Sequence, residues 1–449
     1  MLIQRARTID GTSCDIRVEQ LVVDVDERLE PRPGEEVIDA AHGTVVPGLH
    51  DHHVHLYSAA AALTSVRVGP HEVLGADDLR RALGAAPVGE DGWIRAIGYH
   101  EAVAGPLDRD GLDALSPSVP VRVQHRSGVL WTLNSAGLAA VGLPEHPDGR
   151  LRSNDRGWSG GLQRREVGVA GGLSRVSRRL ASYGVTGVTD ATPDLGVDDV
   201  VAFAEARRHG DLLQHVHCLA PGKRILHDDD LDLAELTEWV EARHRQGGHV
   251  AVHCVTAAQL VVTIAALRAA GGLPGDRIEH AAMVPDDCLA DLAELGIVVA
   301  TQPNFVCERG DQYLIDVPAD DHDQLWRLGS LLAADVPVVL STDMPFGDAD
   351  PWAAMRAAVR RTTASGAPLG PGEAVSARTA LELFHGEPEQ PTHRRTVAPG
   401  QPGDLCVLAA SPDEVLAELA SDMVVATVVA GSVVFDRSRE SAADLGVAK

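Results

Sequence analysis

Aromatic side chains and cysteines are scarce in this sequence. Phe, Trp and Tyr together make up 3% of the 449 residues, so the core has to be built from Ala, Val and Leu, as in many α/β proteins. The six cysteines are scattered, with no C-x-x-C pair. This spacing argues against a disulfide framework, and the reduced thiols of a cytoplasmic enzyme are the simplest interpretation.

Positive charge and long apolar runs are also lacking. The formal net charge is -26, and phosphate binding needs a basic surface, so we expect neither nucleic acid nor an anionic membrane as a partner. Residues 1–10 contain no apolar core of a signal peptide, and no apolar run has the length of a membrane span. We therefore expect a cytoplasmic protein whose partner is a small-molecule substrate.

Lysine is almost absent, because nearly all basic residues are arginines. Lys223 is the only lysine before the terminal Lys449. An arginine bias of this kind follows from the composition of a genome and carries no function by itself. It nevertheless makes Lys223 a residue to examine.

The order of predicted elements indicates the fold class. Buried strands are expected at residues 93–99, 121–125, 185–190, 214–219, 249–254, 277–281, 297–302 and 336–343, with helices rich in Ala and Leu at 233–245 and 257–270. Alternation of strands and helices is typical of a parallel sheet, and the length suits a (β/α)8 TIM-type barrel with additions. Both chain ends are rich in short strands, which favours a small β-sandwich domain built from residues 1–46 and 393–449. The barrel then occupies residues 47–392, with an insertion around 58–165.

Histidines and an aspartate follow the predicted barrel strands. His53 and His55 are two positions apart on a strand, so both imidazoles face the same side and can bind one metal ion. His253, His280 and Asp343 come at the ends of later strands, where barrel enzymes carry their catalytic residues. Taken singly, the histidines could be core residues and Asp343 could cap the following helix. Together they favour a metal centre.

Two motifs carry the most information, Pro47–Leu56, which runs from Pro-Gly-Leu to His-Val-His-Leu, and Arg277–Ala281 with the letters RIEHA. They resemble motifs of the amidohydrolase superfamily, family 3, the group of YtcJ-like and N-substituted formamide deformylase-like hydrolases, in which the first motif belongs to the first barrel strand. Weaker matches are spread along the chain at 124–138, 184–190, 301–303, 341–345 and 399–405. The sequence departs from the family pattern after His253 and after Lys223.

The resemblance implies a set of functional residues. The metal ligands would be His53, His55, Lys223, His253, His280 and Asp343, with one or two divalent ions, expected to be zinc. Lys223 would react with carbon dioxide to give a carbamate, a carboxylated lysine that bridges two metals. Asp343 would be the catalytic proton shuttle for a metal-bound hydroxide. His125 and Gln302 are expected to contact the substrate.

The predicted function is hydrolysis of a carbon–nitrogen bond in an amide, formamide or cyclic amide. One alternative is a mononuclear aminohydrolase that deaminates a heterocycle, since such relatives keep the histidines and the aspartate but do not need Lys223. An alternative of another class is a non-catalytic scaffold barrel, although the full ligand set is present. Closed symmetry is the default for such barrels, so we expect a homo-oligomer, a dimer.

Overall fold

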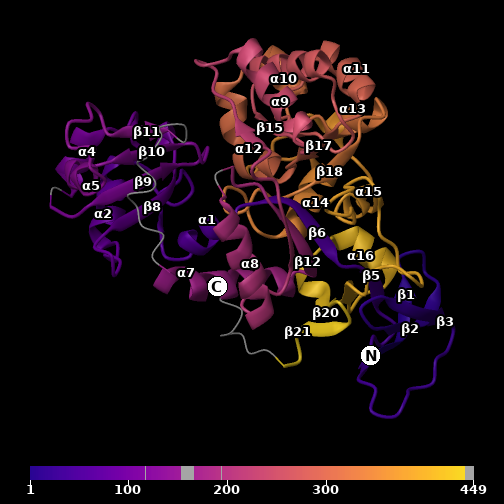
Figure 1. The fold of residues 1–449 in the computed structure, drawn as a ribbon. Helices are drawn as coiled ribbons and strands as arrows, with labels where there is room; N and C mark the ends of the chain where they lie inside the picture. The colour runs from indigo at the N-terminus through magenta and orange to yellow at the C-terminus, as the bar shows by residue number, and fades with distance from the viewer. Residues whose placement is uncertain (117, 153–165, 194, 440–449) are drawn as a thin grey trace. The chain divides into compact units, whose positions relative to one another are not determined.

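The computed structural model describes residues 1–116, 118–152, 166–193 and 195–439, and the chain forms two compact units (Figure 1). The first contains Met1–His55 and Ser174–Lys449, and the second is Leu56–Leu173. Each unit is described by itself. In the described part of the chain, no helix is both long and apolar enough to cross a membrane.

The two ends of the chain share one sheet in the first unit. Its strand order is β21-β20-β19-β5-β1-β2-β3, and β4 pairs with β1. The bounds of these strands are β1 (Leu2–Thr8), β2 (Ser13–Val18), β3 (Val22–Asp26), β4 (Val37–Asp39), β5 (Thr44–Pro47), β19 (Leu405–Leu408), β20 (Val424–Val429) and β21 (Ser432–Asp436). The expectation of a small β domain made from both ends is thereby confirmed.

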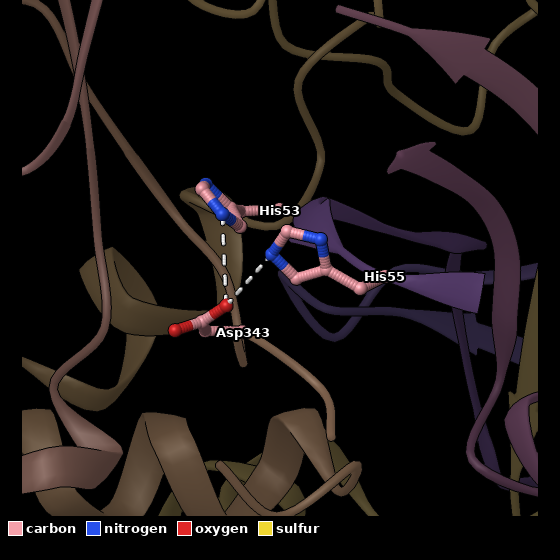
Figure 2. Close-up of side chains that lie close together, drawn as sticks. All are labelled: His53, His55 and Asp343. Atoms are coloured by element: carbon pink, nitrogen blue, oxygen red, sulfur yellow. Dashed lines mark ion pairs between the residues drawn. The ribbon is translucent and has the colours of Figure 1, made fainter. Parts of the chain in front are cut away.

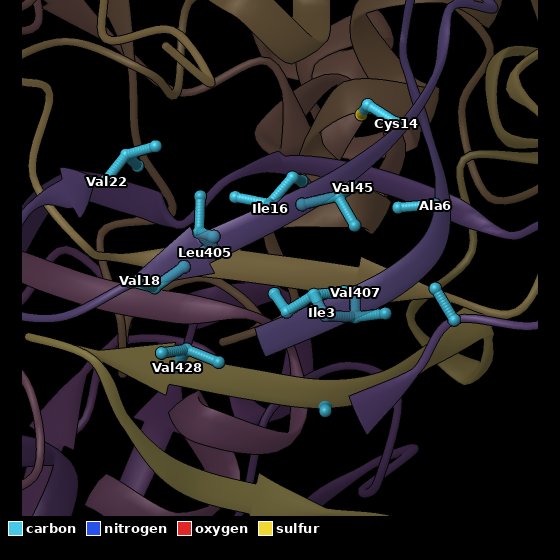
Figure 3. Packing of buried hydrophobic residues seen from close by; sticks show 12 residues of the cluster. Ile3, Ala6, Cys14, Ile16, Val18, Val22, Val45, Leu405, Val407 and Val428 are labelled. Atoms are coloured by element: carbon cyan, nitrogen blue, oxygen red, sulfur yellow. The ribbon is translucent and has the colours of Figure 1, made fainter. Parts of the chain in front are cut away.

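β-Branched residues build the core of this sheet domain. Ile3, Ile16, Val45, Val407 and Val428 are fully buried in one cluster, to which both chain ends contribute (Figure 3). The antiparallel register of β5 and β19 places Val46 opposite Cys406. Because β6 begins only two residues after β5 ends, this pairing anchors the strand that carries the first two histidines.

The rest of the first unit is a TIM-type barrel. Its parallel strands, as far as the chain is described, are β6 (Leu49–Val54), β12 (Val185–Asp190), β13 (His215–Cys218), β14 (Lys223–Ile225), β15 (Ala251–Cys254), β16 (Arg277–His280), β17 (Val298–Thr301) and β18 (Val338–Leu340). They form two runs, β13-β12-β6 and β14-β15-β16-β17-β18. A parallel bridge between Val54 and Met344 joins the ends of β6 and β18 and closes the ring on that side.

Helices follow the barrel strands as expected. They are α8 (Val197–His209), α9 (Leu233–Arg245), α10 (Ala257–Ala270), α11 (Asp286–Leu295), α12 (Asn304–Asp316), α13 (Leu328–Ala333), α14 (Pro351–Arg360), α15 (Ala377–Glu382) and α16 (Pro412–Glu418). The predicted helices at 233–245 and 257–270 are confirmed to the residue. Asp232 and Thr256 explain where they begin, because each side chain accepts a hydrogen bond from the first helical turn.

The second unit has its own small sheet, ordered β11-β10-β9-β8-β7. Its elements are α1 (Leu56–Ala62), β7 (Val66–Arg67), α2 (Ala76–Ala85), β8 (Ile94–Tyr99), α3 (Glu101–Ala104), α4 (Arg109–Leu115), β9 (Val121–His125), β10 (Leu130–Leu133), α5 (Ser135–Ala140) and β11 (Arg150–Arg152), and α7 (Glu166–Ser182) leads back to the barrel. Strands β7, β8 and β9 are parallel. This unit corresponds to the expected insertion.

Candidate metal centre

Strand β6 and the segment after β18 bring His53, His55 and Asp343 together (Figure 2). Alternation along β6 directs both imidazoles to one side, and the backbone N–H of Asp343 donates to the carbonyl of His53 at 2.9 Å. The Nε2 atoms of His53 and His55 lie 3.6 Å and 3.4 Å from one Asp343 oxygen. Two ligand atoms on one tetrahedral zinc ion are roughly 3.3 Å apart, because each bond is about 2.0–2.1 Å long. The three side chains fit one ion.

The backbone at Asp343 is strained. Its φ is 57°, a left-handed conformation that costs free energy outside glycine and is often found at functional sites. Asp51 stabilises this turn from β6, because its carboxylate accepts the backbone N–H of Thr342 at 3.0 Å and also the Thr342 hydroxyl. The Pro-Gly-Leu-x-Asp pattern before the histidines therefore has a physical role, which is to hold the aspartate opposite them.

His253 and His280 extend the cluster from the neighbouring strands β15 and β16. Their ring centroids are 4.5 Å apart, and the His280 ring lies 4.8 Å from that of His53. The φ of His280 is 72°, so the chain leaves regular strand geometry at this residue. This turn lets His280 reach the cluster although it directly follows Glu279.

Hydrogen-bond acceptors fix the orientation of three of these rings. A Glu279 oxygen contacts Nδ1 of His53, the Thr192 hydroxyl lies 3.1 Å from Nδ1 of His55, and the Gln302 amide oxygen lies 2.7 Å from Nδ1 of His280. With the ring proton on Nδ1, Nε2 keeps its lone pair for a metal ion. Glu279 is in turn held by Arg277, whose Nε donates to it at 2.8 Å.

Burial keeps the imidazoles neutral. It is the main cause that lowers the pKa of His53 and of His280 well below the ordinary value, and that lowers the pKa of His253 to about 3. A neutral imidazole is the form that binds metals. These rings are therefore ready to act as ligands throughout the neutral pH range.

Lys223 is buried at the start of β14, next to the strand that carries His253. In the described part of the chain, its Nζ has no hydrogen-bond partner. Burial lowers the pKa of this amine to about 8. A buried, unpartnered amino group is costly and calls for an explanation such as a bound ion or a modification. Lys223 follows the end of β13 by five residues and opens the next strand. Its charge lowers the pKa of His53 and of His253, so it lies close to both rings.

The two residues predicted to contact substrate lie in different surroundings. Gln302 is beside His280, and its amide nitrogen donates to the Ser341 hydroxyl at 2.8 Å, which fixes the amide with its oxygen toward the ring. His125 belongs to the second unit, at the end of β9. Substrate contact by either residue stays a prediction.

Comparison with known proteins gives a family. The chain matches the amidohydrolase family over residues 36–435. It is 25% identical to an N-substituted formamide deformylase from Arthrobacter pascens, over 90% of this chain and 91% of that protein.

Solved structures confirm the fold. An uncharacterised metal-dependent hydrolase from Pyrococcus furiosus has a TM-score of 0.68 at 21% identity, covering 92% of this chain and 99% of that one. A second such hydrolase, from Pyrococcus horikoshii OT3, has a TM-score of 0.71 at 18% identity, covering 92% and 97%.

The chain therefore belongs to the amidohydrolase family, and it is a hydrolase that acts on carbon–nitrogen bonds. The resemblance read from Pro47–Leu56 and Arg277–Ala281 is thereby confirmed. Dependence on a metal ion follows from the family and agrees with the cluster of His53, His55 and Asp343.

The contact between Gln302 and His280 gives a testable effect on metal binding. Gln302→Leu removes the acceptor for the His280 Nδ1–H, so zinc affinity should fall by about 10–100-fold, as is common for residues that orient a ligand. Gln302→Glu keeps an oxygen at that place and should lose less. Competition with a chromophoric zinc chelator measures both variants. Equal affinities of wild type and Gln302→Leu would show that the contact does not orient the ring.

Proposed function

We propose that the protein hydrolyses an amide, formamide or cyclic amide with a zinc-type centre of one or two divalent ions held by His53, His55, Lys223, His253, His280 and Asp343. The observation that carries this proposal is the convergence of two Nε2 atoms on one carboxylate oxygen within 3.6 Å. The A. pascens relative, named as an N-substituted formamide deformylase, favours a formamide as the first substrate to test.

The donor set fits such a centre. Imidazole nitrogens and a carboxylate are the ligands that zinc prefers in catalytic sites. Asp343 is the only carboxylate in the proposed set, and the charge of the nearby Glu279 is balanced by Arg277. Two divalent ions need more negative charge than one carboxylate supplies. A carbamate on Lys223 would add it, and the unpartnered Nζ supports that assignment.

The bound ions would supply acidity to a water molecule and polarise the substrate carbonyl. The chain's own residues then have distinct roles. Asp343 accepts a proton from the attacking water, whose oxygen forms a bond with the carbonyl carbon. As the carbon–nitrogen bond breaks, Asp343 returns that proton to the leaving nitrogen, which gives a carboxylic acid and an amine.

Metal removal tests the proposal as a whole. Dialysis against a strong chelator should abolish hydrolysis of N-substituted formamides, and added zinc should restore it. The metal-free protein should also melt earlier, because an ion at 100 times its Kd stabilises the folded state by about 2.7 kcal/mol. Activity assays and calorimetry before and after dialysis measure both effects. The proposal is refuted if the protein keeps full activity when fewer than about one metal ion per ten chains remains.

A further inference from the structure

The second unit contains another group of side chains with metal-ligand chemistry, His100, Glu101 and His125. Each offers one ligand atom, and these atoms all lie within 4.8 Å of one another. The proposed barrel centre does not use any of the three. All three are half-buried.

Two neighbouring parallel strands create this group. The register of β8 and β9 pairs Tyr99 with His125, so His100 and Glu101, which directly follow β8, emerge at the same edge as His125. The backbone N–H of Arg126 donates to the Tyr99 carbonyl at 2.8 Å and keeps the two strand ends aligned. The carboxyl edge of parallel strands is the usual place for a ligand in an open α/β sheet.

The distances within the group are those of metal ligands. Nε2 of His125 lies 3.1 Å from a Glu101 oxygen, close to the roughly 3.3 Å expected for two ligands of one tetrahedral zinc ion. The His100 and His125 ring centroids are 5.7 Å apart. An Arg150 nitrogen lies 4.0 Å from the other Glu101 oxygen. This distance is too long for a hydrogen bond, so Arg150 does not donate to that oxygen.

The protonation of His125 suits a ligand. Burial lowers the pKa of this imidazole to about 4, so the ring is neutral at pH 7. Nδ1 of this ring accepts the backbone N–H of Ser127 at 3.1 Å, so Nε2 carries the ring proton and donates it to Glu101. When Nε2 binds a cation, the proton moves to Nδ1, where the Ser127 hydroxyl, 2.8 Å away, can accept it in place of that bond.

We propose that His100, Glu101 and His125 form a second, separate divalent-metal site, of the zinc type, in the inserted unit. Two imidazole nitrogens and one carboxylate oxygen are a common set for zinc, and a water molecule completes the coordination. Nδ1 of His100 accepts the N–H of Ala102 at 3.2 Å, a bond that is lost when the ring proton moves to that atom. His125 loses the corresponding bond from Ser127, so both rings move a proton from Nε2 to Nδ1 when they bind the ion.

Zinc counting tests this site against the barrel centre. After equilibrium dialysis against buffered free zinc, elemental mass spectrometry should find one equivalent less in Glu101→Gln, in His125→Ala and in His100→Ala than in wild type. Lys223→Met should lose one equivalent from the barrel centre. Glu101→Gln combined with Lys223→Met should lose two, because the two sets of ligands share no residue.

A matched control is available in the same unit. His146 is also half-buried and lies 3.4 Å from a carboxylate, that of Asp148, but it belongs to no group of three ligands in the described residues. His146→Ala should keep the wild-type count. Equal counts in wild type and Glu101→Gln, or an equal loss in His146→Ala, would overturn the proposal. Zinc-loaded wild-type crystals provide a test without variants. If data collected at the zinc absorption edge show no anomalous peak between His100, Glu101 and His125, the proposed second site is overturned.

Discussion

Asp343→Asn should fold and keep zinc at the histidines while its turnover falls by about 10²–10⁴-fold, the usual contribution of a general acid–base group. Asparagine keeps the size of the side chain and tolerates the positive φ of this position, but it cannot carry the proton from water to the leaving nitrogen. The measurement is kcat for formamide hydrolysis at saturating zinc, with circular dichroism as the check of folding.

The exposed Asp335 is a matched control for this variant. It is also an aspartate with positive φ, 60°, and it makes no part of the cluster of ligands. Asp335→Asn should have wild-type turnover. If Asp343→Asn retains turnover within a few-fold of wild type, then Asp343 is not the proton shuttle and another group has to move the proton.

Lys223→Met should lose one equivalent of metal and roughly 100-fold or more in activity, since removing a ligand costs at least as much as removing a residue that orients one. Methionine has a similar length and is apolar, so burial of this side chain no longer carries the cost of an unpartnered amine. Without metal, the variant should therefore be at least as stable as metal-free wild type. Metal counting, activity and thermal melting on one preparation separate these effects.

The outcome for Lys223→Met also distinguishes between one metal and two. Unchanged metal content with near wild-type activity would indicate a mononuclear centre, in which Lys223 has no ligand role. That result would favour the deaminase alternative and direct the substrate search toward amino-substituted heterocycles.

Much of the barrel and its cluster could be predicted from the sequence, because the signals are local. Strand alternation places His53 and His55 on one side, and the position of strand ends brings Asp343 to the same edge. Helices α9 and α10 were predicted to the residue from stretches rich in Ala and Leu, and Asp232 and Thr256 cap their first turns in the structure.

The contacts that orient the ligands could not be predicted in this way. Glu279 and His280 are adjacent, and strand alternation sends neighbours to opposite sides. The positive φ of His280 breaks that rule, so Glu279 reaches His53 while His280 joins the same cluster. Thr192 is 137 residues from His55, and only the folded barrel brings the two together.

The group at His100 was missed for a related reason. The family resemblance implies substrate contact for His125, and the sequence around it shows no spacing of metal ligands. His100 and Glu101 precede it by more than 20 residues, and only the parallel register of β8 and β9 makes them neighbours. Helices α3 and α4 separate β8 from β9 in the sequence, so the pairing of these two strands cannot be deduced from a single sequence.

The most direct test of the account is a crystal structure of the zinc-loaded protein with data collected at the zinc absorption edge. We predict an anomalous peak within about 2.3 Å of the His53 and His55 Nε2 atoms and of Asp343. Absence of any peak between His53, His55 and Asp343 in active crystals would contradict the central claim that these residues hold the catalytic metal.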